Sequence, residues 1–102
     1  MLSCLVPPSI SDPPVDTTVS QGDTVTIRCV AHGAPNPVIS WIKDSVHLSD
    51  DNVHYDVSSS GTLTIRDVSK GDEGRYRCAA RNSVGSVSTQ MRLTVRGEDF
   101  IN

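Results

Sequence analysis

The side chains of this 102-residue chain that could do chemistry include three cysteines and three histidines. Cys29 and Cys78 each lie in a segment where apolar and polar residues alternate, and neither has a second cysteine at the spacing of a metal-ligand pair. This pattern favours a buried disulfide over a metal site. In the chain-entropy model, closing so long a loop stabilises a domain by about 4 kcal/mol. A disulfide also indicates an oxidising compartment, and it leaves Cys4 as the odd cysteine.

Two of the histidines lie close to acidic residues. His47 and His54 flank Asp50 and Asp51, and imidazole and carboxylate groups could together bind a cation. The polar stretch favours the alternative, a solvated edge loop. The sequence holds no Ser-His-Asp order around a nucleophile turn, no glycine-rich phosphate loop and no carboxylate pair in an apolar setting. We therefore expect no catalytic residues, no cofactor and no metal site.

Arginines recur at alternate positions toward the end of the chain. On a strand, residues two apart face the same side, so Arg75, Arg77 and Arg81 face outward together if Tyr76 and Cys78 are buried. The same parity predicts one outer sheet face made of Arg75, Arg77, Arg81, Arg92, Val38, Ser40 and Ile42.

This basic face with an apolar edge is a candidate protein-binding surface. Arginine is enriched in binding hot spots because its planar guanidinium pairs with carboxylates while its stem packs on apolar groups. The alternative is an ordinary charged solvent face, partly neutralised by Glu73 and neighbouring acids. A sulfated glycan is a weaker candidate ligand for the same face.

Length and composition limit the fold and the partner. A chain of 102 residues with 36% hydrophobic and 4% aromatic residues suits one domain with a thin core. A net charge of −3 argues against nucleic acid as a partner. We expect no membrane insertion, because no apolar run is long enough to span a bilayer. The first residues lack the features of a signal peptide, so a secreted parent would carry its signal elsewhere.

The elements that must position these side chains are short strands. Alternating apolar residues predict strands at 17–20, 24–31, 38–43, 46–48, 52–57, 62–68, 74–82 and 87–95. A loop is expected over 32–37, and a single helical turn over 69–72, where Ser69 and Asp72 form a capping box. A hairpin turn is expected over 82–85, with Asn82 and Gly85 able to take positive φ. Residues 1–8 are interpreted as a leader, 9–96 as the domain and 97–102 as a tail.

Five motifs in order resemble those of an immunoglobulin domain of the intermediate set, the I-set. They are Gly22-x-x-Val25-x-Ile27-x-Cys29, Gly33-x-Pro35-x-Pro37-x-x-x-Trp41, Gly61-Thr62-Leu63-x-Ile65, Asp72-x-Gly74-x-Tyr76-x-Cys78 and Ala80-x-Asn82-x-x-Gly85. The stretch from Trp41 to Gly61 is too short for the two extra strands of a variable domain. The resemblance implies an all-β fold, a two-sheet antiparallel Greek-key β-sandwich.

The resemblance also implies roles for single residues. Trp41 would pack on the Cys29–Cys78 bridge, with Ile27 and Leu63 in the same core, and Tyr76 would be the tyrosine corner. In many members the aspartate that corresponds to Asp72 pairs with a basic residue on the facing strand. No Lys or Arg occurs between Asp44 and Ile65 here, so we expect Asp72 to cap the helical turn instead.

Within the family, the resemblance points to an extracellular, non-catalytic module of a larger adhesion, receptor or matrix protein. Its partners would be proteins, including a second copy or neighbouring immunoglobulin domains. A structural module of a cytosolic muscle or cytoskeletal protein is the alternative, and an accessory domain of a peroxidasin-like matrix haem enzyme is a second one. The form Cys4-x-x-Pro7-Pro8-x-Ile10 resembles the junction where a leucine-rich-repeat cap ends and an immunoglobulin domain begins, which would leave Cys4 without its partner cysteine. The alternative is that Cys4 is an incidental or vector-derived free thiol.

Overall fold

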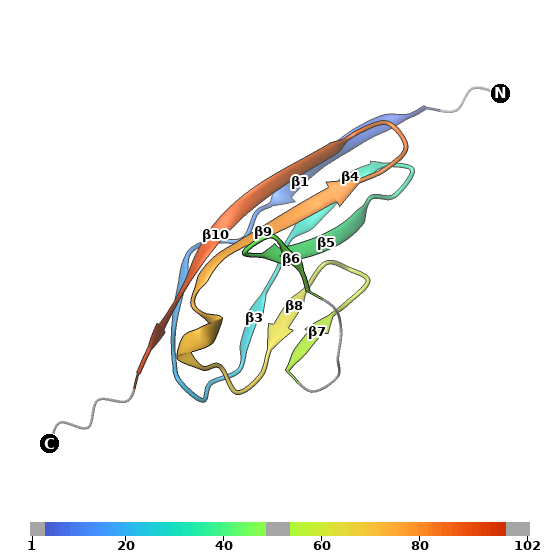
Figure 1. Ribbon diagram of the computed structural model, residues 1–102. Coiled ribbons are helices and arrows are strands. Elements are labelled where there is room, and N and C mark those ends of the chain that lie inside the picture. The colour runs from blue at the N-terminus through green and yellow to red at the C-terminus, as the bar shows by residue number, and fades with distance from the viewer. Residues whose placement is uncertain (1–3, 49–53, 98–102) are drawn as a thin grey trace, which may run out of the picture.

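The computed structural model describes residues 4–48 and 54–97, which form strands and one short 3-10 helix (Figure 1). The strands are β1 (Val6–Asp12), β2 (Thr17–Ser20), β3 (Val25–Ile27), β4 (Val30–Ala34), β5 (Val38–Lys43), β6 (Val46–His47), β7 (Tyr55–Val57), β8 (Leu63–Ile65), β9 (Gly74–Arg81) and β10 (Ser86–Arg96). The helix η1 spans Lys70–Asp72. The all-β fold class is confirmed.

Two main sheets enclose the core. One has the strand order β2-β10-β9-β5-β6 and the other has the order β3-β8-β7, while β1 and β4 form a separate pair. Strand β2 runs parallel to β10, and the other described pairs are antiparallel. In Figure 1, β1 begins at one end of the molecule and β10 ends at the other. The sandwich leaves one face of the five-stranded sheet turned outward.

The core lies between the sheets and includes Ile27, Trp41, Leu63 and Tyr76, as the resemblance implied, while Asp72 is buried beside it. The buried cluster consists of Val25, Ile27, Cys29, Trp41, Leu63, Ile65, Val68, Tyr76, Cys78, Met91, Leu93 and Val95. Cys29, in the segment between β3 and β4, forms a disulfide with Cys78 on β9. The indole Nε1 of Trp41 donates to the carbonyl oxygen of Gly61 at 3.0 Å, so the buried ring has a partner for its one donor.

Residues 30–34 form strand β4, and the predicted strand over 24–31 and loop over 32–37 are therefore partly wrong. Strand β3 ends at Ile27, and the chain then leaves its sheet to pair with β1, with Val6 opposite Ala34. Gly33 lies inside this strand at a close approach between backbones: a Cβ there would stand 3.1 Å from the Val6 carbonyl oxygen. The strand depends on β1, a partner that local sequence does not reveal. Strand β1 itself includes residues 6–8, which were expected in the leader.

The hairpin between β9 and β10 forms as predicted, but for a different reason. Neither Asn82 nor Gly85 has positive φ. The side-chain oxygen of Asn82 instead accepts hydrogen bonds from the backbone N–H groups of Val84 and Gly85, at 2.9 and 3.2 Å. Its Nδ2 donates to the carbonyl oxygens of Val6 and Pro35. Asn82 thus ties the hairpin to β1 and to the loop after β4.

The corner after η1 is fixed by Asp72 and Tyr76. The hydroxyl of Tyr76 donates to the backbone oxygen of Asp72 at 2.5 Å, which confirms the tyrosine corner. The carboxylate of Asp72 accepts from the backbone N–H of Ser69 at 2.9 Å, which confirms the capping box. Burial raises the pKa of the Tyr76 hydroxyl, so this group remains a proton donor.

His54 provides the basic partner that the sequence seemed to lack for Asp72. Its Nε2 lies 2.9 Å from Asp72 Oδ1, and its side chain is 32% exposed, so the imidazole of His54 contacts Asp72 as well as solvent. Burial opposes ionisation of the Asp72 carboxyl, but the hydrogen bonds from His54 and Ser69 outweigh it and lower the pKa of Asp72. Asp50 and Asp51, the other members of the suggested cation site, lie outside the described residues. Within 4–48 and 54–97, no group of three or more His, Cys, Asp or Glu is placed to hold a metal ion.

Candidate protein-binding face

The outward face of the five-stranded sheet is built by strands β5, β9 and β10. Their register pairs Ile42 with Arg77 and Val38 with Arg81, while Arg92 lies opposite Arg75. Directly opposite residues share a face of the sheet, so the register brings the four arginines onto one side. Arg75, Arg77, Arg81 and Arg92 are all exposed. The arrangement predicted from strand parity is therefore present, and its binding role stays a prediction.

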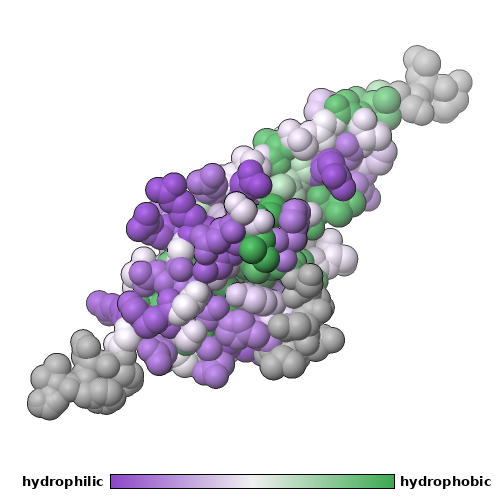
Figure 2. All heavy atoms as spheres, viewed as in Figure 1, coloured by the Kyte–Doolittle hydropathy of each residue, from purple (hydrophilic) through white to green (hydrophobic). Residues whose placement is uncertain are grey.

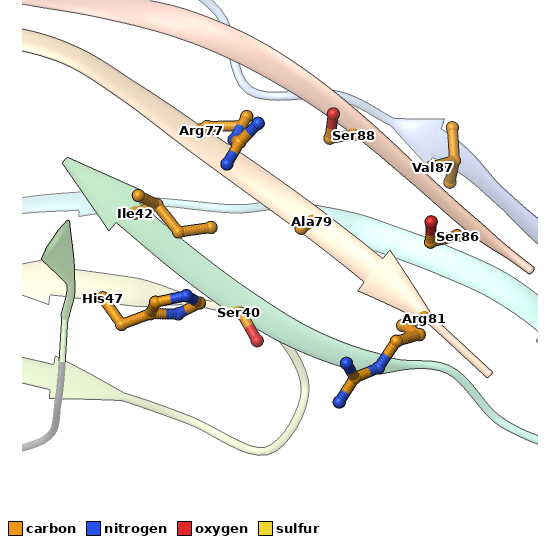
Figure 3. A pocket seen from close by; sticks show the side chains of 9 residues that line it. All are labelled: Ser40, Ile42, His47, Arg77, Ala79, Arg81, Ser86, Val87 and Ser88. Atoms are coloured by element: carbon orange, nitrogen blue, oxygen red, sulfur yellow. The ribbon is translucent and has the colours of Figure 1, made fainter. Parts of the chain in front are cut away.

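A hollow lies in this face between Arg77 and Arg81. It has a volume of about 390 Å³ and is lined by Ser40, Ile42, His47, Arg77, Ala79, Arg81, Ser86, Val87 and Ser88. Figure 3 shows Ala79 between the two arginines on β9, with Ser40 on one neighbouring strand and Ser88 on the other. The register places Ser40 and Ser88 directly across from Ala79. Three short side chains in a row thus form the floor, and two long cationic ones stand at its ends.

The predicted apolar edge of this face is divided between two environments. Val38 is 64% exposed, whereas Ile42 is only 6% exposed although it faces outward. Strand β6 folds back beside β5 and brings His47 opposite Ile42, while Arg77 lies opposite on the other side. The expectation of an exposed Ile42 is wrong, because neighbours on both sides cover it. Ile42 instead contributes to the wall of the hollow.

The guanidinium groups of the face have no ion pair or hydrogen bond with another residue of the described chain. Glu73, which was expected to neutralise them, accepts from the backbone N–H of Val95 at 2.9 Å and lies 3.4 Å from Lys70 Nζ. The hydrogen bond from Val95 and then that from Lys70 lower the pKa of Glu73, with a smaller effect of Arg92. The acid that could balance the face is thus already engaged with other groups.

The two halves of the face differ in their acidic neighbours. A second hollow of about 260 Å³, lined by Arg75, Arg77 and Gln90 among others, also includes Asp44. Asp16 lies beside Arg92, where its Oδ1 accepts from the Arg92 backbone N–H at 2.8 Å. The hollow between Arg77 and Arg81, in contrast, has no acidic residue among the described residues that line it. This half of the face is therefore the better site for an anionic group.

Sequence reasoning missed several residues of the hollow. Ala79, Ser86 and Ser88 follow the same parity as the arginines, so their small size could have indicated a depression. His47 could not have been found in this way, because its place depends on the pairing of β6 with β5. The sequence indicated His47 only as a possible cation ligand beside Asp50.

Outside this face, the exposed hydrophobic residues are unevenly distributed. Figure 2 shows hydrophilic residues over much of the molecule and hydrophobic ones gathered toward the end where β1 begins. Leu5, Val6 and Val84 are among the exposed hydrophobic residues there, near the contacts that Asn82 makes. Among the described residues, no helix is long and apolar enough to cross a membrane.

Comparison with known proteins places this geometry in a family. A model of the immunoglobulin I-set domain matches residues 8–95. A human protein named Peroxidasin homolog is 43% identical over 94 residues, which are 92% of this chain and 6% of that protein. The chain therefore spans only a small part of this relative.

Two solved structures share the fold and a substantial part of the sequence. Drosophila OTK, extracellular domains 3-5, gives a TM-score of 0.83 at 38% identity, over 90% of this chain and 32% of the other. Titin domain M7 gives a TM-score of 0.87 at 31% identity, over 92% of this chain and 98% of the other. The similar proteins thus include both an extracellular region and a titin domain.

Proposed function

This chain belongs to the immunoglobulin I-set family, and from that membership we propose that it is a non-catalytic extracellular module that binds another protein within a larger multidomain protein. The binding surface is the outward face of the five-stranded sheet. The observation that carries the proposal is the hollow between Arg77 and Arg81, where none of the described lining residues is acidic. Unpaired guanidinium groups around a recess suit a complementary protein surface, because arginine contributes both charge and packing area.

The disulfide supports the extracellular part of the proposal. Cys29 and Cys78 are completely buried and bonded to each other. Such bonds persist in oxidising compartments and are rare in the cytosol. The similarity to the extracellular domains of OTK supports the same assignment.

The rival function is that of a structural module in a cytosolic muscle or cytoskeletal protein. The similarity to titin domain M7 favours it. The two functions differ in the redox state of the core cysteines in native material. An extracellular module keeps the bridge, and a module in a reducing cytosol carries two thiols there.

A second candidate is an accessory domain of a peroxidasin-like matrix haem protein. The 43% identity to Peroxidasin homolog favours it. On this account the domain itself binds no haem, and the group belongs to another part of the parent chain. A haem absorbance band in the purified full-length protein would support this candidate, and its absence there would exclude it.

Binding to an array of purified ectodomains, with this chain among them, tests the proposed function. The chain is used as wild type, as Arg77→Glu/Arg81→Glu and as Arg28→Glu/Arg96→Glu. Arg28 and Arg96 are exposed arginines outside the hollow, so the last variant matches the change in charge. The proposal expects a bound ectodomain, a second copy included, that is lost only with the first variant. Binding that survives this variant, or no bound protein at all, would contradict it.

A further inference from the structure

The hollow also specifies what kind of segment it can receive. Resting on the proposed protein-binding function, we propose that it binds an extended acidic segment of the partner, with a carboxylate, an apolar residue and a second carboxylate at alternate positions. The two carboxylates pair with Arg77 and Arg81, and the apolar side chain between them lies over Ala79.

The spacing of the arginines sets the spacing of the carboxylates. Arg77 and Arg81 are four residues apart on β9, and a strand rises by about 3.3 Å per residue, so their Cα atoms are separated by roughly 13 Å. An extended partner segment has the same rise. Two acidic residues four positions apart therefore match the two guanidinium groups, and the residue midway between them faces the same side.

The floor of the hollow sets the character of the middle residue. Ser40, Ala79 and Ser88 are short and lie in one row across the sheet. Ile42 adds an apolar wall on the side of β5. The hollow, with a volume of about 390 Å³, has room for a side chain between the two arginines. An apolar side chain fits because the Ala79 methyl group and Ile42 offer contacts, while a third carboxylate would have no cation of its own.

Charge distribution favours an acidic protein segment over a sulfated glycan. A long polyanion would extend beyond the hollow toward Asp44, which shares a second hollow with Arg75 and Arg77, and toward Asp16, which lies beside Arg75 and Arg92. The chain as a whole has a net charge of −3. Screening limits these repulsions to about 8 Å at physiological salt, so a short segment held between Arg77 and Arg81 escapes most of them.

The probe for this inference is a nine-residue peptide with glutamate at its third and seventh positions, leucine at its fifth and serine elsewhere. Its binding to the ¹⁵N-labelled chain is followed by NMR at physiological salt. We expect the largest shifts at the backbone amides of Ser40, Ala79 and Ser88. A peptide with glutamine for both glutamates should bind about tenfold more weakly or worse. A peptide with the two glutamates adjacent should also bind more weakly, because only one can reach an arginine.

Matched variants connect the effect to the two arginines. Arg77→Gln/Arg81→Gln should lower the affinity for the glutamate peptide by about tenfold or more. Arg28→Gln/Arg96→Gln should change this affinity by less than about twofold. Equal binding of the glutamine peptide, or shifts centred elsewhere, would overturn the inference. A heparin hexasaccharide that shifts the same amides at lower concentration would also overturn it, in favour of a sulfated ligand.

The outcomes separate this inference from the proposed function. If an ectodomain binds and is lost in Arg77→Glu/Arg81→Glu while the glutamate peptide fails, the face binds a protein but not through such a segment. If no ectodomain depends on the two arginines, the proposed function fails, and the inference fails with it.

Discussion

The imidazole Nε2 of His54 lies 2.9 Å from one carboxylate oxygen of Asp72 and 3.1 Å from the other. Asp72 is the one charged residue in the buried part of the described chain, and it also caps η1 and holds the tyrosine corner through its backbone oxygen. The pair therefore connects the edge near β7 to the turn that leads into β9. Breaking the His54–Asp72 pair should therefore lower the free energy of unfolding.

Acid should destabilise the domain through Asp72. The carboxyl has an ordinary pKa of 3.8 and a lower pKa in the folded state, so its contribution is complete above about pH 4 and is lost as the pH falls through the folded pKa. We expect the free energy of unfolding in urea to fall as the pH is lowered below about 4, and Asp72→Asn to flatten this slope. An unchanged slope in the variant would show that another carboxyl is responsible.

Removing the imidazole should destabilise the fold. We expect His54→Ala to lower the free energy of unfolding by about 1–2 kcal/mol at neutral pH, because Asp72 loses a hydrogen bond to its buried carboxylate. His32→Ala, at an exposed position in β4, should change it by less than about 0.5 kcal/mol. Equal effects of the two substitutions in urea denaturation would contradict the assignment of His54.

Trp41 should be among the most costly core residues to truncate. The side chain is fully buried and donates to Gly61, so Trp41→Ala leaves a cavity and an unpaired carbonyl oxygen. We expect a loss of about 3–5 kcal/mol in the free energy of unfolding. A loss below about 1 kcal/mol would be incompatible with a buried tryptophan beside the disulfide.

The cysteines should distinguish the extracellular module from its cytosolic rival. Native protein, unfolded without reductant and titrated with a thiol reagent, should show a single free thiol, because Cys4 is the free cysteine of the described chain. Three free thiols in native material would refute the extracellular account. The rival predicts that second result.

Much of the fold follows from local sequence patterns. The features that were not predicted depend on pairing with strands elsewhere in the chain. Alternation around Cys78 predicted both the buried side of β9 and its arginine side, and the capping box predicted η1. The burial of Ile42 did not follow, because it requires β6 to fold back on β5. Strand β4 was missed because its partner β1 lies far away in sequence.

The candidate site was predictable in its charges but not in its shape. Parity gave the four arginines, yet only the register across three strands shows that Ser40, Ala79 and Ser88 lie in one row. The partner of Asp72 escaped prediction for a similar reason. The expected partner was a lysine or arginine on the facing strand, whereas Asp72 is paired with the imidazole of His54.

The central claim is that the face with Arg77 and Arg81 binds a protein partner. The most direct test measures two properties of Arg77→Glu/Arg81→Glu: its affinity for the bound ectodomain and its melting temperature. Both side chains are exposed, and their guanidinium groups form no ion pair in the described chain, so their reversal should leave the melting temperature within about 2 °C of wild type. The dissociation constant should rise by about a hundredfold, because two attractive contacts become repulsive. An unchanged dissociation constant with an intact fold would contradict a binding role for this face.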